Sequence, residues 1–164
     1  MFQTILVAID ESEAAREAYD LAVRVALEDH SSLLLVNVVD VSQLIAVAGY
    51  ETPYPVDAVE LLRESGKELL DEMKRSCAAK GINVSTATGE GDAVDEILRL
   101  AEENGAGLVC IGTHGRKGLA RLFVGSVAEG VLRRATVPVL VVRPASESHA
   151  GVEGHGVSPA AQTR

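Results

Sequence analysis

Short apolar runs alternate along this chain with longer segments in which apolar residues recur every three or four positions. The run at 4–9 is β-branched and apolar with little alternation, which is typical of a strand buried on both faces. The segment at 12–30 places Ala15, Ala18, Ala22 and Val25 on one stripe, which indicates a helix. The whole pattern predicts strands at 4–9, 33–39, 83–88, 108–111 and 139–142, and helices at 12–30, 56–80, 91–104 and 126–134.

The order of these elements predicts the architecture. Strands that alternate with helices need crossover connections, which favours a parallel sheet covered by helices on both faces. We therefore expect an α/β fold, a three-layer sandwich with a five-stranded parallel sheet, in a single domain over residues 1–144. The more polar segment at 83–88 is expected at a sheet edge. Residues 145–164 hold few large apolar side chains and are expected to form a flexible tail.

Composition and charge exclude several classes of function. The chain has 164 residues and a formal net charge of −9, which argues against nucleic acid as a partner, because phosphate-backbone binding needs a basic surface. No apolar run approaches the ~20 residues of a membrane span, and the first residues lack the pattern of a signal peptide. Cys77 and Cys110 form no CxxC pair or metal-like cluster, so reduced thiols in a cytoplasmic protein are expected.

A glycine-rich stretch holds the candidate chemistry. Gly112 and Gly115, then Gly125 and Ser126, lie between the predicted strand at 108–111 and the last predicted helix. Glycines let a ligand approach the backbone closely, and a helix N-terminus favours negative charge. The Ser126-x-x-Glu129 spacing predicts a capping box at the helix start. The pattern favours a phosphate site for a nucleotide such as ATP, and simple turn glycines are the alternative.

Other phosphate-binding motifs fit poorly. A Walker loop needs Gly-Lys followed by Ser or Thr, but the one Gly-Lys pair, at 66–67, precedes Glu68 inside a predicted helix. A dinucleotide fingerprint needs three glycines after the first strand, and the first strand here ends without one. A phosphoacceptor receiver domain would use acidic residues after strand one, as at 10–11, but its Asp after strand three and Lys after strand five are absent.

Together these residues resemble the universal stress protein family. The resemblance rests on Gly-x2-Gly-x9-Gly-Ser, on Ile-Leu-Val-Ala-Ile-Asp at 5–10, and on the apolar runs at 34–39 and 138–142. The family often has His where this chain has Asn37. The glycine motif is similar to that of the family's ATP-binding branch. The resemblance implies an adenine nucleotide alpha hydrolase-like fold with strand order 3-2-1-4-5 and a ligand where the order reverses.

The resemblance also implies which residues form the site and how the protein assembles. Backbone and base contacts are expected near the first two strands, and phosphate contacts around the glycines, with Mg²⁺ accompanying ATP. It further implies a homodimer formed by pairing of the last strand, and a flap at 40–55 is an open alternative to a surface loop. The implied nucleotide-binding residues are Ala8, Ile9, Asp10, Val38, Ile111, Gly112, Gly115, Arg116, Gly125, Ser126 and Val127.

Three functions remain open on this sequence, and one of them is a purely structural interaction module whose glycines serve turns alone. The first is a cytosolic ATP-binding stress-response or regulatory protein in which the nucleotide acts as a switch or ligand with little or no turnover. The second is a slow ATP hydrolase or a phosphoryl or nucleotidyl transferase. Asp10 is the one acidic residue that is a candidate nucleophile or general base for such a reaction. Asp10 is equally a candidate cap for the first helix. No catalytic or metal-ligating residue is predicted.

Overall fold

A computed structural model describes residues 2–40, 56–113 and 124–144. Its elements alternate as the apolar pattern predicts, although a bound differs from the expected one by a residue or two at several ends. The strands are β1 (Thr4–Ala8), β2 (Ser32–Val39), β3 (Val84–Glu90), β4 (Leu108–Gly112) and β5 (Val139–Val142), and the helices are α1 (Glu13–Asp29), α3 (Val56–Ala79), α4 (Ala93–Glu103) and α5 (Ser126–Arg134).

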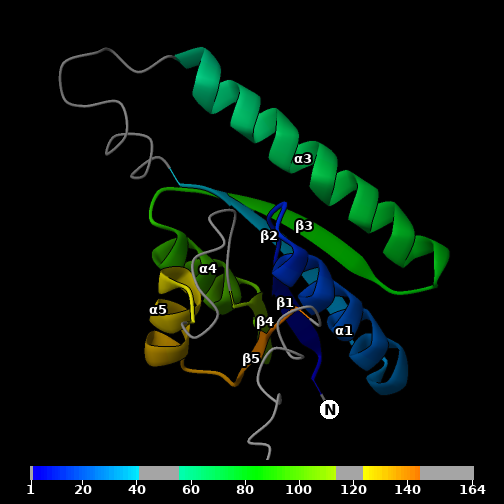
Figure 1. The fold of residues 1–164 in the computed structure, drawn as a ribbon. Coiled ribbons are helices and arrows are strands. Elements are labelled where there is room, and N and C mark those ends of the chain that lie inside the picture. Colours follow the sequence, from blue (N-terminus) through cyan, green and yellow to red (C-terminus); the bar gives the residue numbers. More distant parts are fainter. Residues whose placement is uncertain (1, 41–55, 114–123, 145–164) are drawn as a thin grey trace, which may run out of the picture.

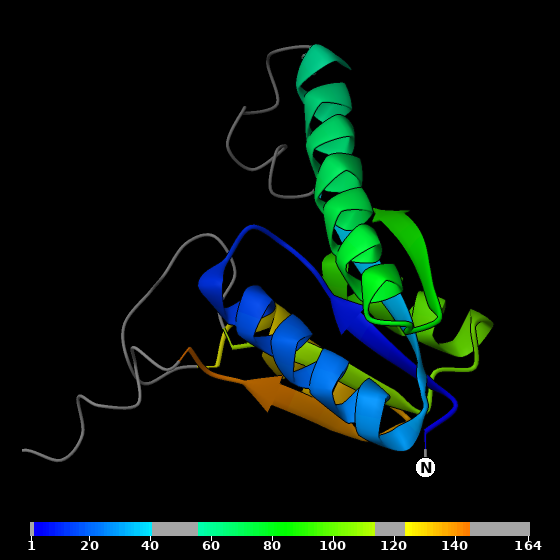
Figure 2. The same ribbon diagram turned by 90° about the vertical axis from the view of Figure 1, so that its right-hand side faces the viewer.

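All five strands pair in parallel in the order β3-β2-β1-β4-β5, so the expected topology is confirmed. β3 lies at one edge, as its polar alternation predicts, and β5 lies at the other. Helices α1 and α3 cover one face of the sheet while α4 and α5 cover the other (Figures 1 and 2). The order reverses between β1 and β4, which places the carboxyl ends of these two strands side by side.

Local sequence explains where several helices begin and end. Ser12 caps α1 by accepting a hydrogen bond from the Ala15 amide, and Asp92 caps α4 in the same way through the Asp95 amide. Gly81 and Gly105, just after α3 and α4, have φ values of 77° and 61°, a conformation that glycine adopts without steric cost.

Two apolar clusters hold the three layers together, one on each face of the sheet. Side chains alternate along each buried strand, so Ile5 and Val7 face α1 and α3 while Leu6 faces α4 and α5. Alanines at 14, 15, 18, 22 and 26 of α1 are buried, which lets this helix lie close to the sheet. None of the described helices is long and apolar enough to cross a membrane.

Two expectations from the sequence are not tested by the described residues. The proposed flap at 40–55 lies outside the described residues except for Asp40, and the proposed tail at 145–164 lies outside them entirely.

Candidate functional site

The turn after β1 is fixed by Asp10 and Ser12. The Asp10 carboxylate accepts hydrogen bonds from the Ser12 amide at 2.9 Å and from the Ser12 hydroxyl. The Ser12 Oγ in turn accepts from the Ala15 amide at 3.1 Å. Ser12, and not Asp10, is therefore the helix cap, while Asp10 holds the cap in place at the carboxyl edge of the sheet.

The apolar residues before this turn point to different faces. The Ile9 side chain is buried in the cluster beneath α1 and α3. Ala8 packs at the margin of the opposite cluster, which also contains Ile111 and borders Val38 and Val127. Of the two residues predicted to line a base, only Ala8 presents its side chain to the face shared by Val38 and Ile111, and Ile9 can contribute only its backbone there.

The end of β4 is packed tightly against the first turn of α1. A Cβ added to Gly112 would lie 2.6 Å from the Ala14 carbonyl carbon and 2.7 Å from its Cβ. Glycine is required there because α1 occupies the space of a side chain. The next residue, Thr113, is buried and donates its amide to the Val142 carbonyl at 2.8 Å, which ties the loop entrance to β5.

The start of α5 differs from the predicted capping box. Gly125 takes the N-cap position and Ser126 is the first helical residue, so no side chain caps this helix. The Gly125 amide donates to the Thr113 carbonyl at 2.5 Å, and this long-range bond sets the glycine at the cap position. The Glu129 amide then makes the first helical bond, to the Gly125 carbonyl at 2.9 Å.

This arrangement leaves backbone donors open at the helix start. Among the residues that the structure describes, the amides of Ser126, Val127 and Ala128 donate to no backbone or side-chain acceptor. Unpaired amides and the helix dipole together make such an N-terminus favourable for an anion. Ser126 is exposed and Val127 is half-buried, so an anion can reach these groups from solvent.

Sheet topology brings most of the predicted residues to one edge. Ala8 ends β1 and Asp10 follows two residues later, Val38 lies near the end of β2, and Ile111 and Gly112 end β4. Gly125, Ser126 and Val127 join this edge through the bond between Gly125 and Thr113. The structure does not test Gly115 or Arg116, because both lie outside the described residues.

The Cys110 thiol, in β4, is unreactive. Cys110 in β4 is fully buried, and burial raises the pKa of its thiol to about 12. Its Sγ also donates a hydrogen bond to the Ala18 carbonyl at 3.3 Å. A thiol in this state is a poor nucleophile. Across the described ranges, no three His, Cys, Asp or Glu side chains are grouped so as to hold a metal ion.

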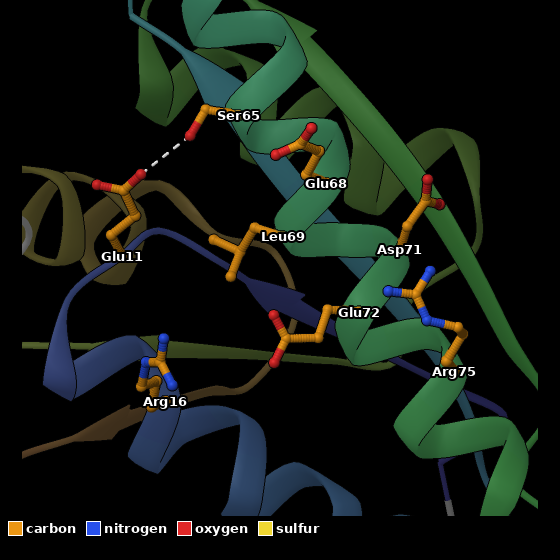
Figure 3. Close-up of a pocket in the computed structure, with 8 residues that line it drawn as sticks. All are labelled: Glu11, Arg16, Ser65, Glu68, Leu69, Asp71, Glu72 and Arg75. Carbon is orange, nitrogen blue, oxygen red and sulfur yellow. Dashed lines mark hydrogen bonds between the residues drawn. The ribbon is translucent and has the colours of Figure 1, made fainter.

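A hollow that the sequence pattern did not reveal lies between α1 and α3 (Figure 3). The Glu11 carboxylate accepts a hydrogen bond from the Ser65 hydroxyl at 3.0 Å across its upper end. No predicted site residue lines it, and its charges are of both signs. The volume is about 520 Å³, and the lining residues are Glu11, Arg16, Ser65, Glu68, Leu69, Asp71, Glu72 and Arg75.

Known proteins share both this sequence and this fold. The sequence profile described as "Universal stress protein family" matches residues 1–143. Universal stress protein MJ0531 of Methanocaldococcus jannaschii is 35% identical over 143 residues, covering 87% of this chain and 83% of its own.

Solved structures agree with these sequence matches. The structure of the protein MJ0577 superposes with a TM-score of 0.75 at 27% identity, covering 87% of this chain and 96% of its own. A universal stress protein crystallised in complex with cAMP superposes with a TM-score of 0.59 at 26% identity, over 86% and 96% of the two chains.

Proposed function

The chain belongs to the universal stress protein family, and from that premise we propose that it is an ATP-binding regulatory protein that turns its nucleotide over slowly or not at all. The observation that carries the proposal is the uncapped start of α5 beside the carboxyl ends of β1 and β4. Three amides at this point have no acceptor among the described residues, which suits the phosphates of a nucleotide. The cAMP complex of a relative supports an adenine nucleotide as the ligand class.

The ligand is proposed to lie across the reversal of the strand order. Ala8, Val38 and Ile111 border the base and ribose, while Ser126, Val127 and the glycines surround the phosphates. Gly115 and Arg116 complete the phosphate site on the strength of the sequence motif alone. Mg²⁺ accompanies ATP and is coordinated through phosphate oxygens, as is usual for this ion.

A role for Asp10 in positioning is favoured over one as a catalytic base. One oxygen of its carboxylate accepts two hydrogen bonds from Ser12, which hold the group against the cap of α1. The nucleotide is therefore proposed to act as a ligand whose presence changes the surface seen by a partner.

Binding and turnover are tested separately. Mass analysis of ligand released from the purified protein identifies what it carries, and calorimetric titration with ATP and Mg²⁺ measures affinity. Release of inorganic phosphate over hours measures turnover. Saturable ATP binding with phosphate release close to that of free ATP supports the proposal. Failure of ATP to bind contradicts it, and steady phosphate release favours the hydrolase alternative.

Dimerisation through β5 is a further part of the proposal. β5 is a sheet-edge strand whose four apolar residues are all half-buried, and such an edge is a template for pairing. The carbonyls of Pro138 and Val142 accept hydrogen bonds from β4, so every second residue of β5 bonds toward β4. Val141 lies between these residues, and its amide therefore points away from β4 toward the open edge. Val141→Pro should therefore convert a dimer to a monomer in sedimentation analysis, while Val141→Ala should leave the dimer intact.

A cytoplasmic location completes the proposal. It is supported by two buried free cysteines, Cys77 and Cys110, which suit a reducing compartment. Fractionation of cells that produce the protein tests this directly.

A further inference from the structure

The outer edge of β3 is open over most of its length. Among the described strands, β3 pairs only with β2. The Asn83 carbonyl and the Gly91 amide bond to β2, so the odd-numbered residues of this segment bond inward. The even-numbered residues Val84, Thr86 and Thr88 therefore point their N–H and C=O groups outward, where no described residue pairs with them.

The chain covers this edge at one end only. The Glu90 amide, the next outward donor, bonds to the carboxylate of Glu96 from α4, and a Cβ added to Gly89 would lie 2.8 Å from that carboxylate. Arg63 of α3 donates to the Glu90 carboxylate at 3.2 Å at the same place. Positions 84–88 have no such cover, and they contain no lysine, proline or bulge of the kind that protects an edge strand.

Helices flank the open edge on both faces of the sheet. α3 and α4 each contact both β2 and β3, and Figure 1 shows α3 running along β3. Because neighbouring strands lie about 4.8 Å apart, each helix axis lies about 2.4 Å inside β3. If β3 of a second copy were added around a two-fold axis, each helix would lie about 10 Å from its copy. This separation is the one at which helices pack.

The sequence of this edge is compatible with antiparallel pairing to itself. When the two-fold axis passes through residue 86, each opposed pair of outward residues exchanges two main-chain hydrogen bonds. All the opposed side chains are small and uncharged, so no like charges meet across the strands. The opposed pairs are Thr86 with Thr86, Val84 with Thr88, and Ser85 with Ala87.

The facing side of α3 favours a second copy over a lone foreign strand. The side that directs Arg63 toward β3 also carries Lys67, Asp71 and Lys74, which follow it at helical spacing. Two antiparallel copies of this side meet with charges of both signs, so Asp71 of one copy can pair with a lysine of the other. A lone strand would gain the main-chain bonds but would leave the sides of α3 and α4 in water.

We propose that β3 is a second self-association edge, at which two copies join their sheets antiparallel with Thr86 at the two-fold axis. Its facing side chains are more polar than those of β5, so the contact forms at a higher protein concentration than the dimer proposed through β5. A chain with two different two-fold edges assembles beyond the dimer, into tetramers and longer rows of sheets. The β3 contact requires no bound nucleotide.

Sedimentation of the full chain over about a hundredfold range of concentration tests this proposal. The unmodified protein should pass from dimer to tetramer as the concentration rises. Thr86→Pro should stop at the dimer, because proline removes an outward N–H and leaves the bonds to β2 in place. Thr86→Ala keeps the amide and should assemble like the unmodified protein. Thermal melts and ATP titration verify that both variants are folded.

Charge reversal tests the two-fold axis itself without changing the main chain. The variants are made together with Val141→Pro, so that only the β3 contact remains and a monomer–dimer equilibrium reports it. Thr86→Glu and Thr86→Lys should each dimerise at least about threefold more weakly, because like charges then meet across the axis. An equal mixture of the two should recover the affinity, since a carboxylate then faces an ammonium group.

Each outcome decides between this contact and the alternatives. The inference is wrong if association of the unmodified protein does not grow with concentration, or if Thr86→Pro assembles as before. If the Glu and Lys variants associate no better together than apart, the copies do not meet at Thr86 and the geometry is overturned. If Val141→Pro alone prevents association at every concentration, β3 pairs with β5 of a second copy instead. None of these results bears on nucleotide binding, so the proposed function stands or falls separately.

Discussion

Helices α1 and α5 both begin at the carboxyl edge of the sheet, yet one start is closed and the other is open. At α1, Ser12 caps the helix, Asp10 holds the cap, and Ala14 packs against Gly112. At α5, Gly125 provides no side chain, and the amides of the first turn have no partner in the described structure. The same helix dipole is thus neutralised by the chain at one point and left for a ligand at the other.

Under the proposed function, this difference would explain how a protein with a net charge of −9 holds an anion. Backbone amides carry no formal charge, so the site does not depend on a basic surface. Under the proposed function, the Asp10 carboxylate at the start of α1 would repel phosphate there, whereas the uncapped start of α5 would accept it. Four sets of substitutions test this contrast, from the largest expected effect to the smallest.

The most direct way to abolish the contrast is Gly125→Asp, which gives α5 a side-chain cap and places a carboxylate at its start, as Ser12 and Asp10 do at α1. We expect ATP affinity to fall about a hundredfold or more, because the carboxylate takes the amides and repels phosphate. Thermal stability should stay the same or rise slightly, since Asp is a good cap residue. Calorimetric titration and thermal melts measure the two effects.

Two matched variants at the same position separate charge from bulk. Gly125→Asn supplies an uncharged cap and should weaken ATP binding less than Gly125→Asp. Gly125→Ala adds a methyl group without a cap and should bind most tightly of the three. Equal affinities in all three variants would show that α5 is not the phosphate site.

The close packing of α1 on β4 is tested by Gly112→Ala. The new methyl group would meet Ala14 at 2.6–2.8 Å, so the helix must shift. Overpacking of this kind is expected to lower the free energy of unfolding by about 1–3 kcal/mol. Gly107→Ala is the control, because its nearest neighbour, Phe2, would lie at an ordinary 3.5 Å. Urea unfolding should leave that control near the unmodified protein, and equal losses in both would contradict the packing account.

Ser12→Ala removes the side-chain cap of α1 and so leaves the start of this helix uncapped. The free energy of unfolding should fall by about 1 kcal/mol. The bared amides should not create a second ATP site, because the Asp10 carboxylate remains beside them. Ser12→Thr retains a hydroxyl and should keep most of the stability. A stoichiometry above one ATP per chain in Ser12→Ala would refute the role given to Asp10.

The smallest effect is expected at the hollow between α1 and α3. Ser65→Ala removes the bond to Glu11, in which Ser65 is half-buried and Glu11 is exposed. ATP affinity should change by less than about twofold and stability by less than about 0.5 kcal/mol. Glu72→Gln, on the same helix as Ser65, should change affinity and stability equally little. A large loss of ATP binding in either variant would move the nucleotide to this hollow and away from α5.

Much of the fold could be predicted because its determinants are local or periodic. Unbroken β-branched runs gave the buried strands, and the polar alternation of β3 correctly placed it at an edge. Gly81 and Gly105 marked helix ends where a positive φ is needed. The periodicity did not show which face of the sheet Ile9 occupies, because that depends on the register of pairing with β2. The pairing places the Ile9 side chain in the core beneath α1 and α3.

The site was less predictable because its key contacts join distant segments. The spacing of Ser126 and Glu129 fits a capping box, but the bond from Gly125 to Thr113 shifts the cap by one residue. The hydrogen bond from the Asn37 side chain to the Ile9 carbonyl, and the close approach of Gly66 to that side chain, depend on strand pairing and on how α3 lies over β2, which no local pattern encodes.

The central claim is that the first-turn amides of α5 bind nucleotide phosphate. Amide NMR spectra of the full chain, recorded during titration with ATP and Mg²⁺, test it directly. The account predicts saturable downfield shifts at Ser126, Val127 and Ala128, absent in Gly125→Asp. Saturable binding that leaves these three amides unmoved, or that shifts residues lining the hollow between α1 and α3 instead, would contradict it.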